Sequence, residues 1–338
     1  MGIIVQLFEN PLNEMFGNFT RILFDFFGNY GLAIIALTVI IRGLLIPFNI
    51  SSQRSMLKNQ ALSAKITEVQ KKYPNDKQKR EEEIMRLQQE NGAMSISGCI
   101  IPVIQIFLIW PIFRVVSAPL RHISQVSVAN IEKMMDLAGL DSSKAAVDNI
   151  QLIQRLGQDS NLLQKCIDKG YIAMGQLMDL NFLGIDLTMT PSITKWTSDP
   201  AYLPLLMIPI LVVATSVLSI MLANRMKPDY KAKKEAKANQ KVNPSAISVQ
   251  ADSTERTALI MNWVFPVIML ISCFTMPAAM GLYWIIGGIM GIITQVVVFF
   301  LLTRPYENKK KELEAQKELA IEALKTAKLV VSNGKKKK

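Results

Sequence analysis

Long apolar runs constrain what this chain can fold into more than any other feature. Five runs consist mostly of apolar residues and cover Tyr30–Ile50, Ser95–Val116, Tyr202–Ala223, Ala258–Met276 and Ala279–Leu302. A helix of about 20 residues crosses the ~30 Å hydrocarbon core of a bilayer. Only helices and closed barrels satisfy their backbone hydrogen bonds in lipid. The sequence therefore predicts an all-α polytopic membrane protein with five transmembrane helices.

The basic residues predict the orientation of these helices. The chain has a formal net charge of +11, and 28 of its 38 Lys and Arg residues lie in residues 51–92, 224–257 and 303–338. Short cytoplasmic segments carry an excess of Lys and Arg. We therefore expect the amino terminus outside and the carboxyl terminus in the cytoplasm.

One arginine lies inside the first apolar run, in the stretch Thr38–Pro47. Placing Arg42 near the bilayer centre costs roughly 2.5 to more than 10 kcal/mol, and the other four runs contain no Asp or Glu to offset it. Its side chain either extends to the interface, ~12 Å of helix away, or lies in a water-filled cavity, and we favour the cavity. Thr38 and Asn49 share helical spacing with Arg42, which predicts a polar stripe on one helix face.

The segments between the runs complete the predicted organisation. In chain order it comprises an outer interfacial amphipathic helix at 1–29, a transmembrane helix at 30–50, a cytoplasmic helical hairpin at 51–92, a transmembrane helix at 93–116, an outer segment with short helices at 117–200, a transmembrane helix at 201–223, a basic cytoplasmic loop at 224–257, transmembrane helices at 258–276 and 279–302, and a basic cytoplasmic tail at 303–338.

The outer segment and the last run carry further expectations. Ile131–Leu137, Ile150–Leu156 and Leu162–Ile167 are typical of short amphipathic helices, which we expect to form a cap too small for a large core of its own. His122 is the only histidine and has no predicted role. In the last run, Gly287 and Gly291 form a small-xxx-small pair that favours close helix packing.

Motifs of enzymes are missing from the sequence. It contains no Gly-x-x-x-x-Gly-Lys-Ser/Thr phosphate loop and no His-Glu-x-x-His, and its apolar runs hold no Ser, His and Asp set. We therefore predict a protein that is not an enzyme and that uses no cofactor and no metal ion.

Four motifs point to one family. They are Thr38–Gly43 followed by a basic hairpin, then Ser97–Gln105, Asn181–Leu187 and Met276–Trp284. In this order, and together with five predicted spans, they closely resemble the YidC-type insertases of the YidC/Oxa/Alb superfamily. The form resembled has five spans and no large periplasmic domain. The stretch 119–179 is longer than a minimal relative needs, and its role is open.

The resemblance implies a membrane protein insertase and chaperone that inserts nascent proteins into the bacterial plasma membrane. It implies a polar groove open to the cytoplasm and to lipid, carrying Arg42, Thr38, Gln105, Tyr283 and Trp284. The implied partners are nascent membrane proteins, the ribosome, the signal recognition particle and its receptor, and the Sec translocon, with no DNA. The basic tail suits ribosomal RNA phosphates or anionic lipids equally well.

Two other functions remain open at the level of sequence. A small-anion transporter or channel would use Arg42 as its binding site, although no internal repeat of the kind common in transporters is visible. A scaffold that only assembles other membrane subunits would need no groove.

Overall fold

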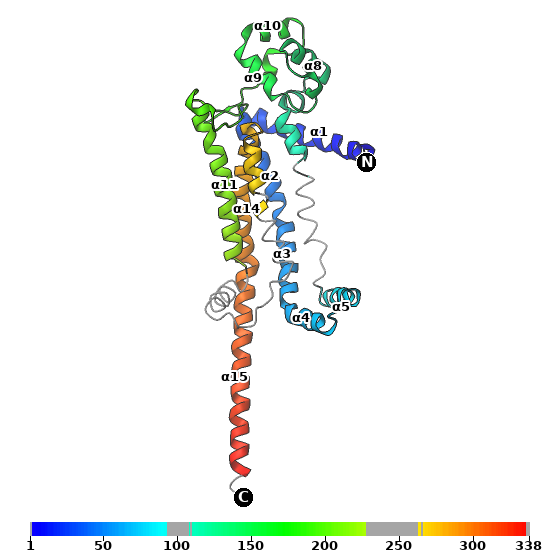
Figure 1. The fold of residues 1–338 in the computed structure, drawn as a ribbon, viewed down its shortest axis with the longest axis vertical. Helices are drawn as coiled ribbons and strands as arrows, with labels where there is room; N and C mark the ends of the chain where they lie inside the picture. The colour runs from blue at the N-terminus through cyan, green and yellow to red at the C-terminus, as the bar shows by residue number, and fades with distance from the viewer. Residues whose placement is uncertain (1, 93–107, 109, 228–262, 265, 336–338) are drawn as a thin grey trace. The chain divides into compact units, whose positions relative to one another are not determined.

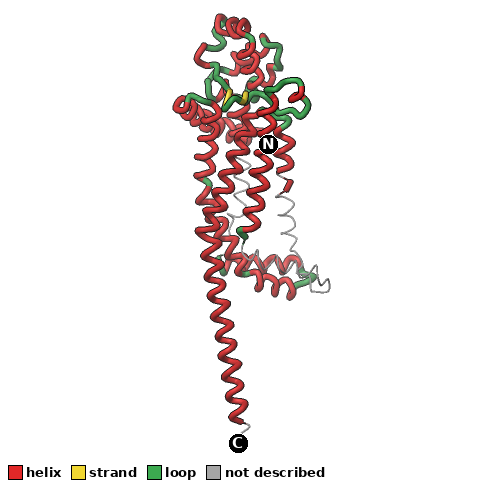
Figure 2. Tube along the Cα trace, turned by 90° about the vertical axis from the view of Figure 1, so that its left-hand side faces the viewer, coloured by secondary structure: helices red, strands yellow, loops and turns green. Residues whose placement is uncertain are grey.

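The computed structural model of the protein describes residues 2–92, 108, 110–227, 263–264 and 266–335 (Figure 1). Its described part is almost entirely helical, and its one sheet has two short strands, shown in yellow in Figure 2. By contacts the chain divides into two units. The first comprises residues 1–47, 99–221 and 249–293, and the second comprises residues 48–98, 222–248 and 294–338.

The elements follow one another along the chain as follows. They are α1 (Gly2–Phe27), α2 (Tyr30–Leu44), α3 (Ile46–Ala61), α4 (Ser63–Lys72), α5 (Lys77–Glu90), α7 (Pro119–His122), α8 (Val128–Leu137), η1 (Ser142–Lys144), α9 (Ile150–Gln158), α10 (Ser160–Asp168), η2 (Met174–Gln176), β1 (Asn181–Phe182), β2 (Ile185–Asp186), η3 (Lys195–Thr197), α11 (Tyr202–Arg225), α14 (Ala278–Val298), the π-helix η4 (Phe299–Thr303) and α15 (Arg304–Lys335).

Three helical stretches within the described residues are long and apolar enough to cross a membrane. They cover Tyr30–Ala61, Tyr202–Arg225 and Ala278–Ala323. The prediction of an all-α membrane protein with several spans is therefore confirmed. Most of the predicted span 93–116 lies outside the described residues, and so do 258–262 and Phe265 of the predicted span 258–276. Residues 110–117 and 266–273 are helical.

The first predicted span is divided into two helices, α2 and α3, and the polar stripe through Thr38, Arg42 and Asn49 stays a prediction. The helix is interrupted at Leu45, whose backbone N–H bonds to the carbonyls of Ile41 and Arg42, both at 3.2 Å. Pro47 has no N–H to donate to the carbonyl of Gly43, and its ring crowds that turn. The break between α2 and α3 therefore falls between Arg42 and Asn49.

Helix α1 is amphipathic and lies across the start of α2 (Figure 1). Phe16 and Thr20 are buried on its protein side, and the Thr20 hydroxyl donates to the Phe16 carbonyl at 2.6 Å. Met15, Ile22 and Phe26 form an exposed apolar side, and Phe26 is 80% exposed. A helix with this pattern suits the plane of a membrane interface.

The outer segment is packed around buried apolar side chains. Helices α8, α9 and α10 pack their apolar sides together, and Ile131, Met134, Leu152 and Cys166 are fully buried. A buried polar side chain connects this core to α7, because Asn149 Oδ1 accepts from the Leu120 N–H at 3.1 Å. These residues belong to one apolar cluster with residues of α2, α11 and α14, so the outer segment shares its core with the other helices of the first unit.

A small set of contacts joins the outer segment to the starts of α2 and α14. The Phe182 ring lies against Gly31, and Asn29 Nδ2 donates to the Asn181 carbonyl at 3.2 Å. At α14, the N–H groups of Ala278 and Ala279 donate to the carbonyls of Met189 and Leu187 at 2.8 and 3.1 Å. The first N–H groups of a helix have no partner inside it, so these carbonyls act as its cap.

The second unit contains the hairpin of α4 and α5. The chain turns at residues 73–76, where Asp76 Oδ1 accepts from the Lys79 N–H at 3.0 Å and thereby caps α5. Leu57 and Leu62 are buried, whereas α5 has no buried residue. With so little apolar burial, the hairpin has low local stability.

We expect Gly31→Ala to destabilise the protein. An ideal Cβ at this position would overlap the Phe182 ring and lie 2.8 Å from Phe182 Cβ, and overpacking of this kind costs about 1–3 kcal/mol. Thermal melting in detergent tests it, with Gly43→Ala on the same helix as the control because nothing lies within 4 Å of its ideal Cβ. Gly31→Ala should cost less in a Phe182→Ala background than in the unmodified chain, because the ring is gone; an equal cost in both backgrounds would contradict the contact.

His122 gives a second prediction, on acid stability. Burial, together with the charges of Arg121 and Arg114, lowers its pKa to about 4. Between the unfolded pKa of about 6.5 and pH 4, the unfolded chain binds a proton that the folded chain excludes, so folding stability falls as the pH falls. The loss at pH 5 should be about 2 kcal/mol.

Melting curves at pH 7 and pH 5 measure this loss. His122→Gln stays neutral at both values, so its melting temperature should change less with pH than that of the unmodified chain. His122 is the only histidine, so no second imidazole contributes to the change of melting temperature between pH 7 and pH 5. An equal pH effect in both proteins would contradict the assignment.

Candidate functional site

Arg42 lies in the last turn of α2 and is half-buried. The residues one turn earlier on its helix, Leu37 and Thr38, are fully buried, whereas Val39 and Ile40 are exposed. The guanidinium therefore lies at the border between the packed side of α2 and its exposed apolar side.

Helix α14 provides the surface against which the guanidinium rests. An ideal Cβ on Gly287 would lie only 3.1 Å from Arg42 Nη2, so the absence of a side chain makes room for the cation. One turn earlier on α14, Tyr283 is 4% exposed, and its hydroxyl lies close enough to Arg42 for the two groups to interact. Tyr283 and Gly287 thus hold the guanidinium between them.

The other predicted groove residues have different outcomes. Thr38 is 1% exposed, and its hydroxyl donates to the Ile34 carbonyl in its own helix at 2.7 Å. Its proton is therefore used within α2. Trp284 is half-buried and packs against the apolar core. Gln105 lies outside the described residues. The structure thus brings Arg42 and Tyr283 together, and it places Thr38 one turn from Arg42 on the packed side of α2.

Sequence reasoning missed the second role of the glycines on α14. Gly288 faces Thr215 of α11, whose Oγ1 would lie 2.8 Å from an ideal Cβ, and Gly291 faces Ser219 Oγ at 3.7 Å. Gly287 faces Arg42 instead, so the predicted Gly287 and Gly291 pair does not act as one surface. Gly281 faces Ile208 of α11, and Gly288 faces Thr215. Both pairs are seven residues apart along their helices, and this equal spacing is the signal in the sequence that could have predicted the contact.

The electrostatics of the site follow from its composition. Helices α2, α11 and α14 contain no Asp or Glu. A guanidinium has five N–H donors in a fork that fits a carboxylate or a phosphate. Among the described residues, no group of three or more His, Cys, Asp or Glu could hold a metal ion. The arrangement is suited to attracting and releasing an anionic group.

Comparison with known proteins gives one family and many relatives. A family model described as 60Kd inner membrane protein matches residues 22–303. A protein of Caldanaerobacter subterraneus subsp. tengcongensis named "Membrane protein insertase YidC" is 35% identical over 125 residues, which are 37% of this chain and 59% of that protein. A protein of the same name from Clostridium tetani is 34% identical over 33% of this chain and 50% of that protein. Another, from Helicobacter pylori, is 39% identical over 28% of this chain and 17% of that protein. The matches thus cover less than two thirds of each of these relatives.

A graded series at Gly287 tests the position of Arg42. Gly287→Ala requires the flexible guanidinium to shift by a few tenths of an ångström, and we expect about a twofold loss of the insertion activity that is proposed below. Gly287→Leu displaces the guanidinium and should cost about tenfold, the loss of one charge-assisted hydrogen bond. Gly291→Ala is the control, because its ideal Cβ makes only an ordinary contact. Full activity of a folded Gly287→Leu protein would contradict the arrangement.

Proposed function

The chain belongs to the 60Kd inner membrane protein family, and on that basis we propose that it inserts nascent membrane proteins into a bacterial cell membrane. The observation that carries the proposal is the position of Arg42. This cation lies in an apolar helix, half-buried, and is held by Tyr283 and Gly287 of a second apolar helix. The names of the relatives support the same activity.

The mechanism that we propose begins with a short polar segment of the substrate. Moving such a segment into hydrocarbon is costly because its polar groups lose their water. In a hydrated groove beside Arg42, the segment keeps part of its solvation, and an acidic side chain pairs transiently with the guanidinium. Tyr283 and Gly287 fix the position of the cation, so little side-chain entropy is lost when the substrate arrives.

Release follows from the same physical terms. The apolar segment of the substrate moves sideways into lipid, and burial of its apolar surface is the favourable step. This partitioning supplies the free energy without a nucleotide or a cofactor. The half-buried state of Arg42 keeps its attraction for a carboxylate moderate, because water screens part of the charge. A fully dry ion pair would hold the segment in place.

The remaining parts of the proposal come from the resemblance and from charge. Thr38, Gln105 and Trp284 would line the groove with Arg42 and Tyr283. The α4 and α5 hairpin would receive the substrate or its targeting factors at the cytoplasmic side, with the amino terminus outside. The charged helix α15 carries the basic tail, which would contact the ribosome or anionic lipids. The signal recognition particle, its receptor and the Sec translocon are further proposed partners.

Substitution of Arg42 tests the proposal. Arg42→Ala should reduce insertion of a substrate with an acidic translocated segment at least tenfold, the effect of losing one charge-assisted interaction. Arg42→Lys should retain part of the activity because it keeps the charge. Protease protection of the substrate in vesicles reconstituted with the purified full chain is the measurement. Arg225→Ala, at the end of α11, is the matched control.

Changing the substrate separates the charge effect from a general defect. When the acidic residues of the translocated segment are replaced by Asn and Gln, the Arg42→Ala protein should lose its disadvantage. Full insertion of the acidic substrate by Arg42→Ala would refute the role of Arg42. Anion flux through vesicles without any substrate would favour a transporter instead.

A further inference from the structure

A polar cavity of about 360 Å³ lies where α1 meets α7 and the loop that follows it. Its polar lining residues are Asn13, Glu14, Asn18, Arg121, His122 and Gln125. None of them lies in a predicted span or near the Arg42 site in the sequence. Ligand pockets occupy about 300–1,000 Å³, so this cavity is large enough for a small polar group.

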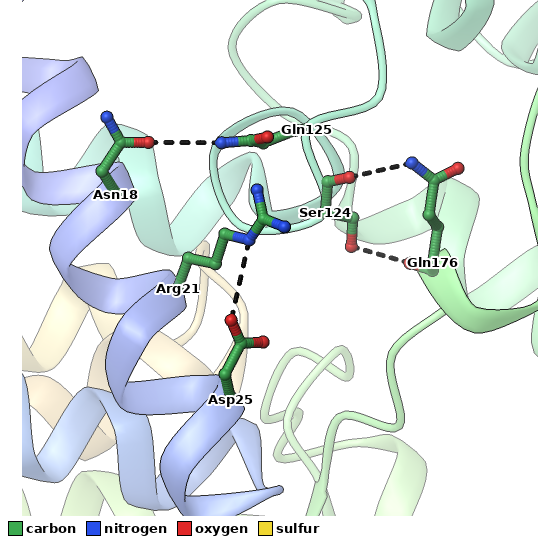
Figure 3. Close-up of polar contacts among 6 residues, drawn as sticks. All are labelled: Asn18, Arg21, Asp25, Ser124, Gln125 and Gln176. Carbon is green, nitrogen blue, oxygen red and sulfur yellow. Dashed lines mark hydrogen bonds and ion pairs between the residues drawn. The ribbon is translucent and has the colours of Figure 1, made fainter.

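The walls of the cavity are tightly built. Gly17 of α1 lets the two elements approach, since an ideal Cβ there would lie 3.1 Å from the His122 carbonyl oxygen. Gln125 has a left-handed backbone, with a φ of 54°, and its Nε2 donates to Asn18 Oδ1 at 3.3 Å. Figure 3 shows this contact beside the two hydrogen bonds between Ser124 and Gln176, at 2.7 and 3.0 Å. A non-glycine residue in this conformation persists only where its surroundings hold it.

Two buried polar atoms in the lining have no hydrogen-bond partner among the described residues. His122 is 8% exposed, and its Nε2 is one of these atoms. The other is Asn13 Oδ1, on the opposite wall. A buried polar atom without a partner costs about 1–3 kcal/mol, so a group that entered the cavity and bonded to either atom would recover part of this cost.

The two walls differ in chemical character. On the α7 wall, Arg121 is fixed by the hydrogen bond from its Nη1 to the Ala146 carbonyl at 2.8 Å, and the remaining guanidinium N–H groups carry a positive charge. His122, with its lowered pKa, is neutral at pH 7 and can donate from Nε2 in one tautomer. On the α1 wall, Glu14 provides a carboxylate and Asn13 an amide oxygen. Donors therefore face acceptors across the cavity.

We propose that this cavity binds an amino-phosphate group, as found in the headgroup of an ethanolamine phospholipid. The phosphate would accept from Arg121 and His122, and the primary ammonium would donate to Glu14 and Asn13. Phosphate oxygens suit guanidinium donors, and an ammonium has three donors that need acceptors.

The surroundings of the cavity favour a lipid as the source. Glu14 and Asn18 lie on the polar side of α1, whereas Met15, Ile22 and Phe26 form its exposed apolar side. A helix of this kind lies at the boundary between headgroups and acyl chains. A headgroup in the cavity would therefore sit at the level of its own lipid layer.

Labelling of the only histidine gives a direct test. The full chain, purified in detergent without a polyhistidine tag and labelled at histidine ¹³Cε1, has one imidazole signal, from His122. We expect dihexanoyl-phosphatidylethanolamine to shift this signal saturably, with at least fivefold higher affinity than dihexanoyl-phosphatidylglycerol. Free phosphoethanolamine and inorganic phosphate are titrated in parallel. Saturation by the ethanolamine lipid alone identifies a lipid source, and similar saturation by phosphoethanolamine identifies a soluble source; both support the site.

Substitutions on α1 separate recognition of the amine from general effects. Glu14→Gln should weaken binding of the ethanolamine lipid at least fivefold, the effect of losing one charge-assisted hydrogen bond, and should not weaken binding of inorganic phosphate. Asp25→Asn is the matched control, because Asp25 is exposed on the same helix, pairs with Arg21 at 3.7 Å and does not line the cavity (Figure 3).

Arg121→Gln should weaken binding of every phosphate probe, with Arg155→Gln of α9 as its control. Melting curves check that each variant is folded. Equal affinity for the ethanolamine lipid, the glycerol lipid and phosphate would overturn recognition of the amine. The absence of any saturable shift would overturn the site itself.

Discussion

The contact between the Arg42 guanidinium and α14 is the interaction on which the candidate site depends. A cation in an apolar helix is costly, and the structure reduces this cost with one hydroxyl, on Tyr283, and one missing side chain, at Gly287. These two residues are one turn apart, so a single face of α14 holds the guanidinium. Any change that moves this face relative to α2 moves the cation as well.

The position of α14 is in turn fixed at two places. Along its length, Gly281 and Gly288 admit Ile208 and Thr215 of α11. At its start, the first N–H groups bond to the carbonyls of Leu187 and Met189 in the outer segment, and the same segment packs Phe182 on Gly31 of α2. Substitutions in the outer segment can therefore affect the site from a distance, because that segment connects the two helices that build it.

The sequence predicted some of these features correctly and missed others for identifiable reasons. The apolar runs determined the class of fold, because a segment of this length in lipid satisfies its backbone hydrogen bonds by forming a helix. The apolar run did not reveal the break at Leu45, two residues before Pro47, that divides the first predicted span into α2 and α3. His122 was given no role, because a lone histidine has no pattern in sequence. Its burial against Gly17 results from two elements that are about a hundred residues apart along the chain.

The sequence by itself determined that this chain crosses the membrane more than once, that Arg42 lies in an apolar helix, and which family the chain resembles. These properties follow from composition and local order, because transfer into lipid depends on the residues of each segment. Only the tertiary structure decided that Tyr283 and Gly287 receive Arg42, that Thr38 turns inward, and that α1 and α7 enclose a polar cavity with two unpartnered atoms. Such pairings depend on the packing of distant segments, which no local pattern encodes.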